Sequence, residues 1–214
     1  MGKINQGILG GVSGKVGNVV GGNWKGIDYL RIMPASVANP KTPAQVDQRT
    51  KFVTVLRFLQ SITPFLRVGY KNYAVKMTQF NSAMSEILKN AVTGSYPNYQ
   101  IDYGNVLVSK GLLPNVLNPS AASVIPGNNI AFSWTDNSGM GDASATDKAI
   151  VVVYCPDLND ATYITEGGSS RDSETHTIAV PSSYAGKDVE VYISMISEDG
   201  SKVSNSLHVD TVTM

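Results

Sequence analysis

The chain has 214 residues, of which 42% are hydrophobic and 16% charged, and its formal net charge at pH 7 is zero. This length can hold one large domain or two small ones, each with a buried core. A single cysteine, Cys155, and two histidines, His176 and His208, exclude a disulfide framework and a multi-cysteine metal site, so we expect neither a metal nor a cofactor.

The first 33 residues are rich in glycine but also contain regularly spaced β-forming residues. Val19 and Val20 precede a Gly-Gly-Asn run at 21–23, and Trp24, Ile27, Tyr29 and Ile32 follow it. Glycine supplies the positive φ that tight hairpin turns need. The pattern therefore predicts a β-hairpin over residues 4–33, with its turn at 21–23 and its end at Pro34.

The glycines do not form a phosphate-binding loop. A P-loop requires Gly-Lys followed by Ser or Thr, with a further glycine five residues before the second one. Here Val16 follows Gly14-Lys15, and Leu9 stands where the first glycine is needed. A dinucleotide fingerprint also requires a helix directly after the glycines, and the β-forming residues that follow do not predict one.

The hydrophobic period then changes to that of helices. Thr42 and Pro43 are typical of a helix start, and an apolar stripe of Val46, Val53, Leu56 and Leu59 predicts a helix over about 43–63. A second helix is expected over about 72–92, and its apolar residues have heptad spacing: Tyr73, Met77, Phe80, Met84, Ile87 and Ala91. A strand is expected over about 100–108, and residues 111–119 are expected to form a linker.

Residues 121–214 contain short β segments separated by clusters of turn residues. The expected strands are 122–125, 129–135, 148–155, 161–165, 175–180, 188–197 and 202–213. Seven such strands are typical of an immunoglobulin-like sandwich. Val189, Val191 and Ile193 alternate with Glu190 and Tyr192, which predicts one buried and one solvated face for that strand. The fold class is therefore α+β.

The neutral total conceals two oppositely charged halves. Residues 1–114 carry 9 lysines and 4 arginines against 4 acidic residues, a net charge of +9. Residues 115–214 carry 4 basic and 13 acidic residues, a net charge of −9. We expect a basic α+β assembly domain at 1–114 and an acidic immunoglobulin-like domain at 121–214. Such a dipole can steer partners, but two domains of different ancestry would also account for it.

Two resemblances add to this interpretation. The runs Ile-Ala-Phe-Ser-Trp at 130–134, Val-Val-Tyr at 152–154 and Val-Glu-Val-Tyr-Ile at 189–193 resemble a fibronectin type III or related immunoglobulin-like domain. Over its whole length the chain resembles an uncharacterised bacterial family with proteins of about this size. The features that carry this resemblance are Met-Gly-Lys-Ile at 1–4, Trp24-Lys25-Gly26 with Tyr29 and Arg31, Asn39-Pro40-Lys41-Thr42-Pro43-Ala44-Gln45 with Arg49, and Asp199 to Ser206. The Asn-Pro-x-Thr-x-Ala-Gln-x-x-x-Arg element also resembles one in phage structural proteins.

These observations favour a non-enzymatic structural subunit of a large homo-oligomer, such as a phage virion component or a filament. The N-terminal region would mediate subunit contacts, and the immunoglobulin-like domain would project or bridge neighbours. Contacts between a basic and an acidic half are heterologous and head-to-tail, and other virion or filament proteins would be further partners. The predicted assembly residues are Gly14, Lys15, Val16, Val19, Val20, Trp24, Lys25, Ile27, Tyr29 and Arg31.

The alternative is a binding module whose immunoglobulin-like domain recognises a glycan or a protein through exposed aromatics such as Tyr163 and Tyr184. No catalytic motif occurs, and we expect neither an enzyme nor direct nucleic-acid contact, because the basic residues of the first half accompany no nucleic-acid-binding motif. The N-terminus lacks signal-peptide architecture, and no window is long and apolar enough for a membrane span. We expect synthesis in the cytoplasm without a classical signal peptide and a final place in a virion or extracellular assembly.

Overall fold

The structure, a computed structural model, describes residues 3–4, 10–24, 26–36, 39, 41–74, 77–124, 127–166 and 168–214. The chain divides into two compact units, Met1–Thr42 and Pro43–Met214. Each unit is described by itself below.

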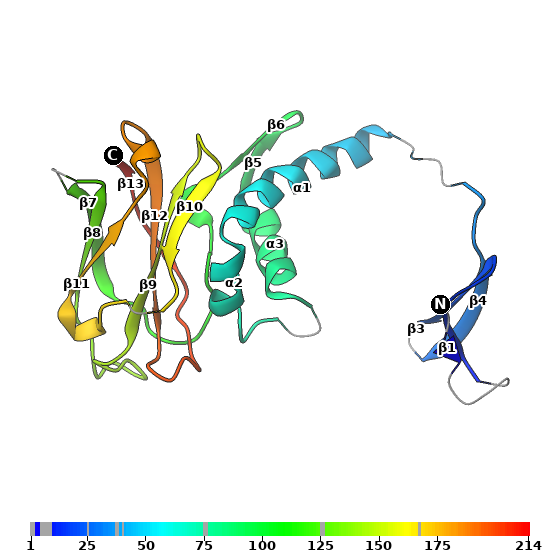
Figure 1. The fold of residues 1–214 in the computed structure, drawn as a ribbon, viewed down its shortest axis with the longest axis horizontal. Helices are drawn as coiled ribbons and strands as arrows, with labels where there is room; N and C mark the ends of the chain where they lie inside the picture. Colours follow the sequence, from blue (N-terminus) through cyan, green and yellow to red (C-terminus); the bar gives the residue numbers. More distant parts are fainter. Residues whose placement is uncertain are drawn as a thin grey trace. The chain divides into compact units, whose positions relative to one another are not determined.

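The N-terminal unit is a four-stranded antiparallel meander in the order β1-β2-β3-β4 (Figure 1). Its strands are β1 (Lys3–Ile4), β2 (Val12–Val16), β3 (Val19–Trp24) and β4 (Ile27–Ile32). The expected hairpin over 4–33 is therefore part of a larger sheet. The expected turn at 21–23 is wrong, because these residues lie inside β3 and the turns lie on either side of it.

Three helices begin the second unit: α1 (Pro43–Ser61), α2 (Thr63–Gly69) and α3 (Gln79–Asn90). The first expected helix ends close to where the sequence predicts, and Pro64 stands in the first turn of α2, where its missing N–H is tolerated. The expected helix over 72–92 begins later, because the Thr78 side chain accepts a hydrogen bond from the Asn81 N–H and caps α3. Within the described residues, none of the helices is long and apolar enough to cross a membrane.

The apolar face of α1 differs from the expected stripe. Val55, Phe58 and Leu59 are buried, whereas Val53 is exposed. Phe58 packs edge-on against Tyr154 of the sandwich, with ring centroids 4.8 Å apart. Leu59 and, in part, Leu56 of the expected stripe do pack on the core, but the buried side is shifted toward Val55 and Phe58.

A short hairpin follows α3, formed by β5 (Val92–Ser95) and β6 (Asn98–Ile101), and a 3-10 turn spans Tyr103–Asn105. The expected strand over 100–108 is thus only partly regular. After the 3-10 turn the chain runs beside the 203–206 segment, where the Ser206 hydroxyl accepts a hydrogen bond from the Val108 N–H at 2.8 Å. The Ser109 hydroxyl donates to the Ser204 carbonyl at 2.8 Å.

The remaining strands form the predicted seven-stranded immunoglobulin-like sandwich. They are β7 (Leu117–Val124), β8 (Asn129–Thr135), β9 (Lys148–Cys155), β10 (Asp160–Ile164), β11 (Thr175–Ala179), β12 (Asp188–Ile196) and β13 (Leu207–Thr213). Two short 3-10 turns, Arg171–Ser173 and Ser182–Tyr184, lie between them. One sheet has the order β10-β9-β12-β13 and the other β11-β8-β7. The α+β fold class is confirmed.

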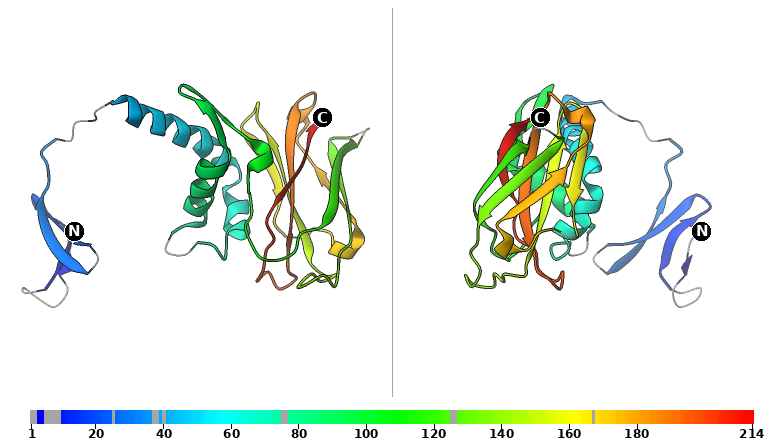
Figure 2. Two further views of the ribbon diagram at one scale, coloured as in Figure 1. Left: turned by 180° about the vertical axis from the view of Figure 1, so that it is seen from behind. Right: turned by 60° about the vertical axis from the view of Figure 1, so that its left-hand side comes forward.

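The second unit has three layers, with the sheet β10-β9-β12-β13 in the middle (Figures 1 and 2). On one face, Ile150, Val152, Tyr154 and Tyr192 pack against the helices. On the other face, alternate residues of β9 and β12 pack against Phe132 and the rest of the β11-β8-β7 sheet. This central sheet is therefore buried on both sides.

The expected solvated face of β12 is consequently wrong. Tyr192 and Ser194 are fully buried, and Glu190 is nearly so. The Tyr192 hydroxyl donates a hydrogen bond to the Tyr103 carbonyl at 2.9 Å. Alternation alone does not identify a solvated face, because the polar side chains of β12 have partners inside the protein: Glu190 bonds to His208 and Thr211 of β13, and the Ser194 hydroxyl donates to the Ile150 carbonyl.

The compact units also differ from the expected division at 114–121. Residues 111–119 do not separate two bodies: Leu113 and Val116 are buried, and the Leu113 N–H donates to the Val203 carbonyl at 3.1 Å. A Cβ on Gly111 would lie 1.8 Å from that same carbonyl oxygen, so the two chain segments approach as closely as glycine allows. The helices and the sandwich therefore share one unit, and its boundary lies at Thr42 and Pro43.

Candidate functional site

The N-terminal sheet forms around two tight turns. The first joins β2 to β3 through Gly17 and Asn18, and Gly17 has a φ of +58°. The second joins β3 to β4, where Gly26 has a φ of +88°. The Asn23 side chain supports this turn, because it accepts the Gly26 N–H at 2.9 Å and donates to Asp28 at 2.8 Å.

Inside β3, Gly21 allows a close backbone approach. An added Cβ at Gly21 would lie 1.9 Å from the Val12 carbonyl oxygen, a distance that no side chain tolerates. The glycine run at 21–22 therefore allows β2 to bend over β3. This requirement for space, and not a turn, explains why glycine occupies the position.

One face of this sheet carries four exposed apolar side chains, which we call the apolar face: Val16, Val19, Leu30 and Ile32. Val16 is paired with Val19, and Val19 with Ile32, so the three side chains lie side by side across β2, β3 and β4. Their exposed fractions are 53%, 37% and 80%, and that of Leu30 is 63%. Adjacent exposed apolar side chains of this kind are typical of an interaction surface.

The other face combines aromatic, apolar and basic side chains. Lys15, Val20 and Arg31 form one cross-strand row, since Lys15 pairs with Val20 and Val20 with Arg31. Ile27 and Tyr29 lie on the same face of β4, and both are exposed. The Tyr29 ring lies over Gly22, where an added Cβ would be 2.9 Å from the phenolic oxygen.

The described part of the N-terminal unit contains no buried apolar side chain. The buried hydrophobic residues of the described chain begin at Val55, in α1. A small sheet normally needs one face packed on another layer to be stable by itself. The described residues between 10 and 36 do not supply such a second layer.

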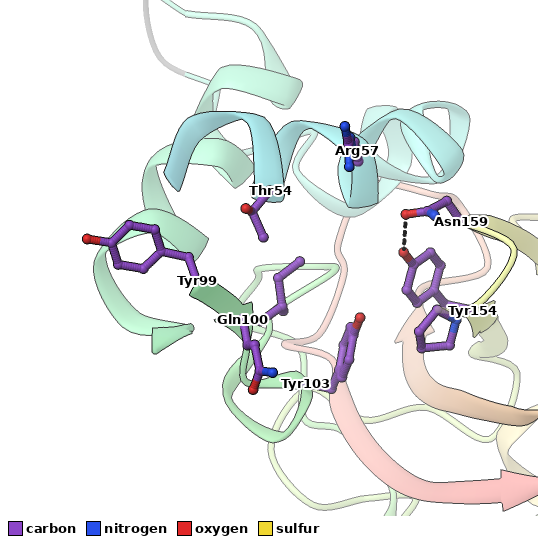
Figure 3. A pocket seen from close by; sticks show the side chains of 9 residues that line it. Thr54, Arg57, Tyr99, Gln100, Tyr103, Tyr154 and Asn159 are labelled. Carbon is purple, nitrogen blue, oxygen red and sulfur yellow. Dashed lines mark hydrogen bonds between the residues drawn. The ribbon is translucent and has the colours of Figure 1, made fainter. Parts of the chain in front are cut away.

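The second unit carries a separate open pocket of about 520 Å³ between α1, the β5–β6 hairpin and the loop after β9. Its lining residues are Thr54, Arg57, Tyr99, Gln100, Ile101, Tyr103, Tyr154, Pro156 and Asn159. Figure 3 shows Tyr103 and Tyr154 beneath α1, while Tyr99 points away from them. The Tyr154 hydroxyl donates to the Asn159 side-chain oxygen at 3.4 Å.

Two tyrosines fix the chemical character of this pocket. Burial raises the pKa of both Tyr103 and Tyr154, so both hydroxyls stay protonated through the neutral range. Their ring centroids are 5.8 Å apart, which makes a tilted aromatic pair. Together with Arg57 and Asn159, they present hydrogen-bonding groups beside an aromatic wall.

Comparison with known proteins places this architecture in a family. A family profile matches residues 11–210, which run from the N-terminal sheet through the helices to the last strand of the sandwich. The chain belongs to the DUF6266 family. That family is described as one of unknown function, so membership of DUF6266 assigns no activity to these surfaces.

Other comparisons add little to the DUF6266 assignment. A solved structure described as the fourth FNIII domain of a human protein is 20% identical, with a TM-score of 0.28; the match covers 57% of this chain and 91% of that one. No curated protein sequence matches the chain. The strand order of the two sheets therefore carries the fold assignment. The resemblance to phage structural proteins remains a prediction.

The structure divides the predicted assembly residues of the DUF6266 chain between the two sheet faces. Val16 and Val19 belong to the apolar face and Gly14 lies on the same side of the sheet, whereas Lys15, Val20, Ile27, Tyr29 and Arg31 lie on the other side. Trp24 lies in β3 opposite Ile27, but its side chain is outside the described part of the structure, as is Lys25. Sequence reasoning missed Leu30 and Ile32, although the alternation in Tyr29-Leu30-Arg31-Ile32 contains that signal.

The expected aromatic platform of the sandwich does not form. Tyr184 is fully buried, and its hydroxyl donates to Asp160 at 3.1 Å. Tyr163 is half-buried and packs edge-on against Phe65 of α2. Contacts with α2 and with Asp160 thus remove both rings from the surface at which an aromatic platform would have to lie.

A buried polar cluster, which the sequence did not indicate, holds the 114–116 segment against the sandwich. Arg171 is fully buried and donates to Asp147 at 2.9 Å, to Asn137 at 2.6 Å and to the Pro114 carbonyl at 2.8 Å. Its own carbonyl accepts the Trp134 indole N–H at 2.8 Å. Each of these buried donors and acceptors has a hydrogen-bond partner, so we assign the cluster a role in stabilising the fold.

In the described ranges, no group of three or more His, Cys, Asp or Glu side chains is arranged to hold a metal ion. Asp136 accepts from Ser138 within its own turn, and Asp142 pairs with Lys202 at 2.7 Å. Among the basic residues of the first half, Lys51 pairs with Asp47 at 3.4 Å and lies 4.8 Å from the Tyr99 ring centroid.

Proposed function

We propose that the protein is a non-enzymatic structural subunit and that copies of it associate through the N-terminal sheet. The observation that carries this proposal is the apolar face, whose four side chains are exposed on a sheet with no described core of its own. Fully burying one such side chain contributes about 1.5–3 kcal/mol. Covering the row Val16, Val19 and Ile32 would thus stabilise both the sheet and the contact.

Charge supports a second copy of the chain as the partner. Residues 1–42 carry 4 lysines and 1 arginine against 1 aspartate, a net charge of +4, and the remaining residues carry −4. The basic sheet of one subunit is therefore attracted to the acidic body of the next. A contact between different surfaces is heterologous, and it builds a ring or an open filament.

The proposal also specifies the kind of assembly. The element from Asn39 to Arg49 resembles one in phage structural proteins, which favours a virion component or a filament. Other virion or filament proteins would then be further partners. We propose synthesis in the cytoplasm and a final place in the virion or an extracellular assembly.

Mass photometry of the purified chain at nanomolar concentration and light scattering at micromolar concentration test the proposal. We expect oligomers for the full chain and a monomer for a Val19→Lys, Ile32→Lys double variant. Leu112→Lys is the matched control, because Leu112 is 89% exposed but lies in the second unit. A full chain that stays monomeric at micromolar concentration would refute self-assembly.

Salt provides an independent test of the head-to-tail contact. The Debye length falls from about 10 Å at 0.1 M to about 3 Å at 1 M salt, so attraction between exposed charges weakens. We expect the largest oligomers to shorten as salt rises. Oligomers whose size is unchanged at 1 M salt would argue against charge as the basis of this contact.

The second candidate function is a binding module, and the pocket beneath α1 favours it. Protonated tyrosine hydroxyls, an amide and a guanidinium beside aromatic rings suit a neutral hydroxyl-rich ligand such as a glycan. NMR titration with maltotriose tests this. Tyr103→Phe should abolish the chemical-shift changes at the pocket. Tyr96→Phe, at an exposed site outside the pocket, should leave them unchanged. Equal spectra with and without the sugar would refute binding of this probe class.

A further inference from the structure

Strand β4 forms one edge of the N-terminal sheet, and its outward backbone groups can be identified. β4 pairs only with β3 among the described strands. In an antiparallel pair, hydrogen-bonded and non-hydrogen-bonded residue pairs alternate. The Met33 N–H donates to the Asn18 carbonyl at 2.8 Å, so residues 33, 31, 29 and 27 point their backbone groups toward β3.

The backbone N–H and C=O groups of Asp28, Leu30 and Ile32 therefore point away from the sheet. No hydrogen bond from a described residue reaches them. Natural edge strands are commonly protected by proline, a bulge or very short length. β4 has six residues, no proline before Pro34 and a regular register throughout, so its only edge protection of the kinds known in natural sheets is its two charged side chains, Asp28 and Arg31.

This edge is complementary to itself. If two β4 strands pair antiparallel about a two-fold axis at Leu30, then Leu30 lies opposite Leu30 of the second copy and Asp28 lies opposite Ile32. Every outward N–H and C=O then meets an outward group of the other strand, because the three residues are spaced symmetrically. Shifting the strands by two residues in one direction would place Pro34, which has no N–H, opposite Asp28. Shifting them in the other direction would place Gly26 opposite Ile32, and the Gly26 N–H is already bonded to the Asn23 side chain.

We infer that β4 pairs with β4 of a second copy in this register and joins two N-terminal sheets into one continuous sheet. The inference rests on the proposed self-assembly and specifies the contact. A two-fold contact of this kind is isologous, so pairs of subunits joined head-to-tail would build the larger assembly.

In this register Leu30, Tyr29 and Arg31 form favourable cross-strand pairs, whereas Asp28 lies opposite Ile32 and contributes backbone bonds only. On the apolar face, the two Leu30 side chains are direct neighbours across the new strand pair. On the other face, Arg31 lies opposite Tyr29 of the second copy, and the reverse pair repeats it. A guanidinium beside a tyrosine ring is an attractive cation–π arrangement, and it keeps the two Arg31 side chains apart.

Cysteine crosslinking tests the register directly. The native Cys155 is buried, so an introduced cysteine is the only accessible thiol in the described part of the chain. In the proposed register the Cα atoms of the two Leu30 residues are about 5.5 Å apart, which lies within the range a disulfide can bridge. Leu30→Cys, in the full chain under mild oxidation, should give a covalent dimer as the main product.

Ile27→Cys is the matched control. Ile27 is at least as exposed as Leu30 and lies on the same strand. In the proposed register it is opposite Met33 of the second copy, so the two introduced thiols would be about 20 Å apart along the strands. We expect no dimer from this variant, and equal crosslinking of both variants would overturn the register.

A backbone test separates edge pairing from simple apolar contact. Leu30→Pro removes the outward N–H without removing a hydrogen bond to β3, whereas Leu30→Thr keeps this N–H and removes the same apolar side chain. We expect the proline variant to lose the two-fold contact and the threonine variant to retain it. Circular dichroism of both variants checks that the rest of the chain folds.

The outcomes distinguish this inference from the proposed function. Oligomers of the full chain without Leu30→Cys crosslinking would overturn β4 pairing and leave self-assembly intact. A monomeric full chain would overturn both. Loss of the contact in both Leu30 variants would assign it to the side chain, which also contradicts edge pairing.

Discussion

Arg171 shows how one buried charge can hold three segments of the chain together. Its guanidinium bonds to Asp147 before β9, to Asn137 after β8 and to the Pro114 carbonyl ahead of β7. Such a pair contributes less net stability than its short distances imply, because both charges lose water on burial. Removing one partner, however, leaves the other charge buried without compensation.

We expect Arg171→Met to lower the free energy of unfolding by about 3–5 kcal/mol, since it leaves Asp147 unpaired in the interior. Urea denaturation followed by circular dichroism measures this change. Lys202→Ala, which breaks the exposed pair with Asp142, is the control and should leave the free energy of unfolding nearly unchanged. Equal effects of the two variants would contradict the structural role of the cluster.

His176 gives the folded chain a pH dependence of definite sign. The Ser169 N–H donates to the Nδ1 atom of His176 at 3.3 Å, so the proton of the neutral ring is on Nε2. This Nε2 atom has no hydrogen-bond partner in the described part of the chain. Burial lowers the pKa of His176 below its ordinary value of 6.5. The unfolded state therefore binds the proton more readily than the folded state.

We expect the free energy of unfolding to be highest above pH 6.5 and to fall as the pH drops below that value toward the folded-state pKa. Urea denaturation at pH 7.5 and pH 5.5 measures the change. In His176→Phe this decrease should be smaller than in the unaltered chain. An identical decrease in the two proteins would show that other groups cause it.

Residue roles were the hardest part to predict from the sequence. Arg171 stands in a polar loop, where a solvated charge is the default, and only the fold reveals that Asp147 and Asn137 converge on it. Leu30 and Ile32 could have been found, because strand alternation places them together. The predicted residues Val16 and Val19 do lie with them on one face.

At the scale of elements, the strands of the sandwich were predicted well. β8 and β9 have the expected bounds, because their apolar runs are flanked by clear turn residues. The helices were predicted in type, but the side of α1 that is buried was predicted only in part. That choice depends on the β10-β9-β12-β13 sheet, which lies far along the sequence and which local periodicity cannot indicate.

The contact between α1 and this sheet predicts a contrast between two phenylalanines. Phe58 is fully buried against Tyr154, whereas Phe52 is 46% exposed on the same helix. We expect Phe58→Ala to lower the free energy of unfolding by about 3–5 kcal/mol and Phe52→Ala to have a much smaller effect. Thermal and urea denaturation measure both, and a comparable loss at Phe52 would contradict the packing described.

At the scale of the whole molecule, the helices and the sandwich depend on each other. The charge asymmetry predicted a boundary near residue 114, but hydrogen bonds between 108–113 and 203–206 join the two halves. Net charge counts residues over a segment and carries no information on which surfaces are covered. The boundary at Thr42 and Pro43 follows from packing alone.

We expect a fragment of residues 43–214 to fold cooperatively, because it retains both hydrophobic clusters. A fragment of residues 115–214 would expose Val152, Tyr154 and Tyr192 to water, so it should unfold or aggregate. Expression, circular dichroism and thermal denaturation of the two fragments measure this. A stable, monomeric 115–214 fragment would contradict the interdependence of the layers.

The helical layer also determines which side of the sandwich stays open to solvent. With the outer face of β10-β9-β12-β13 covered, the outer face of β11-β8-β7 remains, and the two cross-strand rows at its centre are Ser120-Ser133-Thr175 and Ala122-Ala131-Thr177. These short side chains make a smooth sheet surface with few flexible groups to immobilise. A surface of this kind has little side-chain entropy to lose.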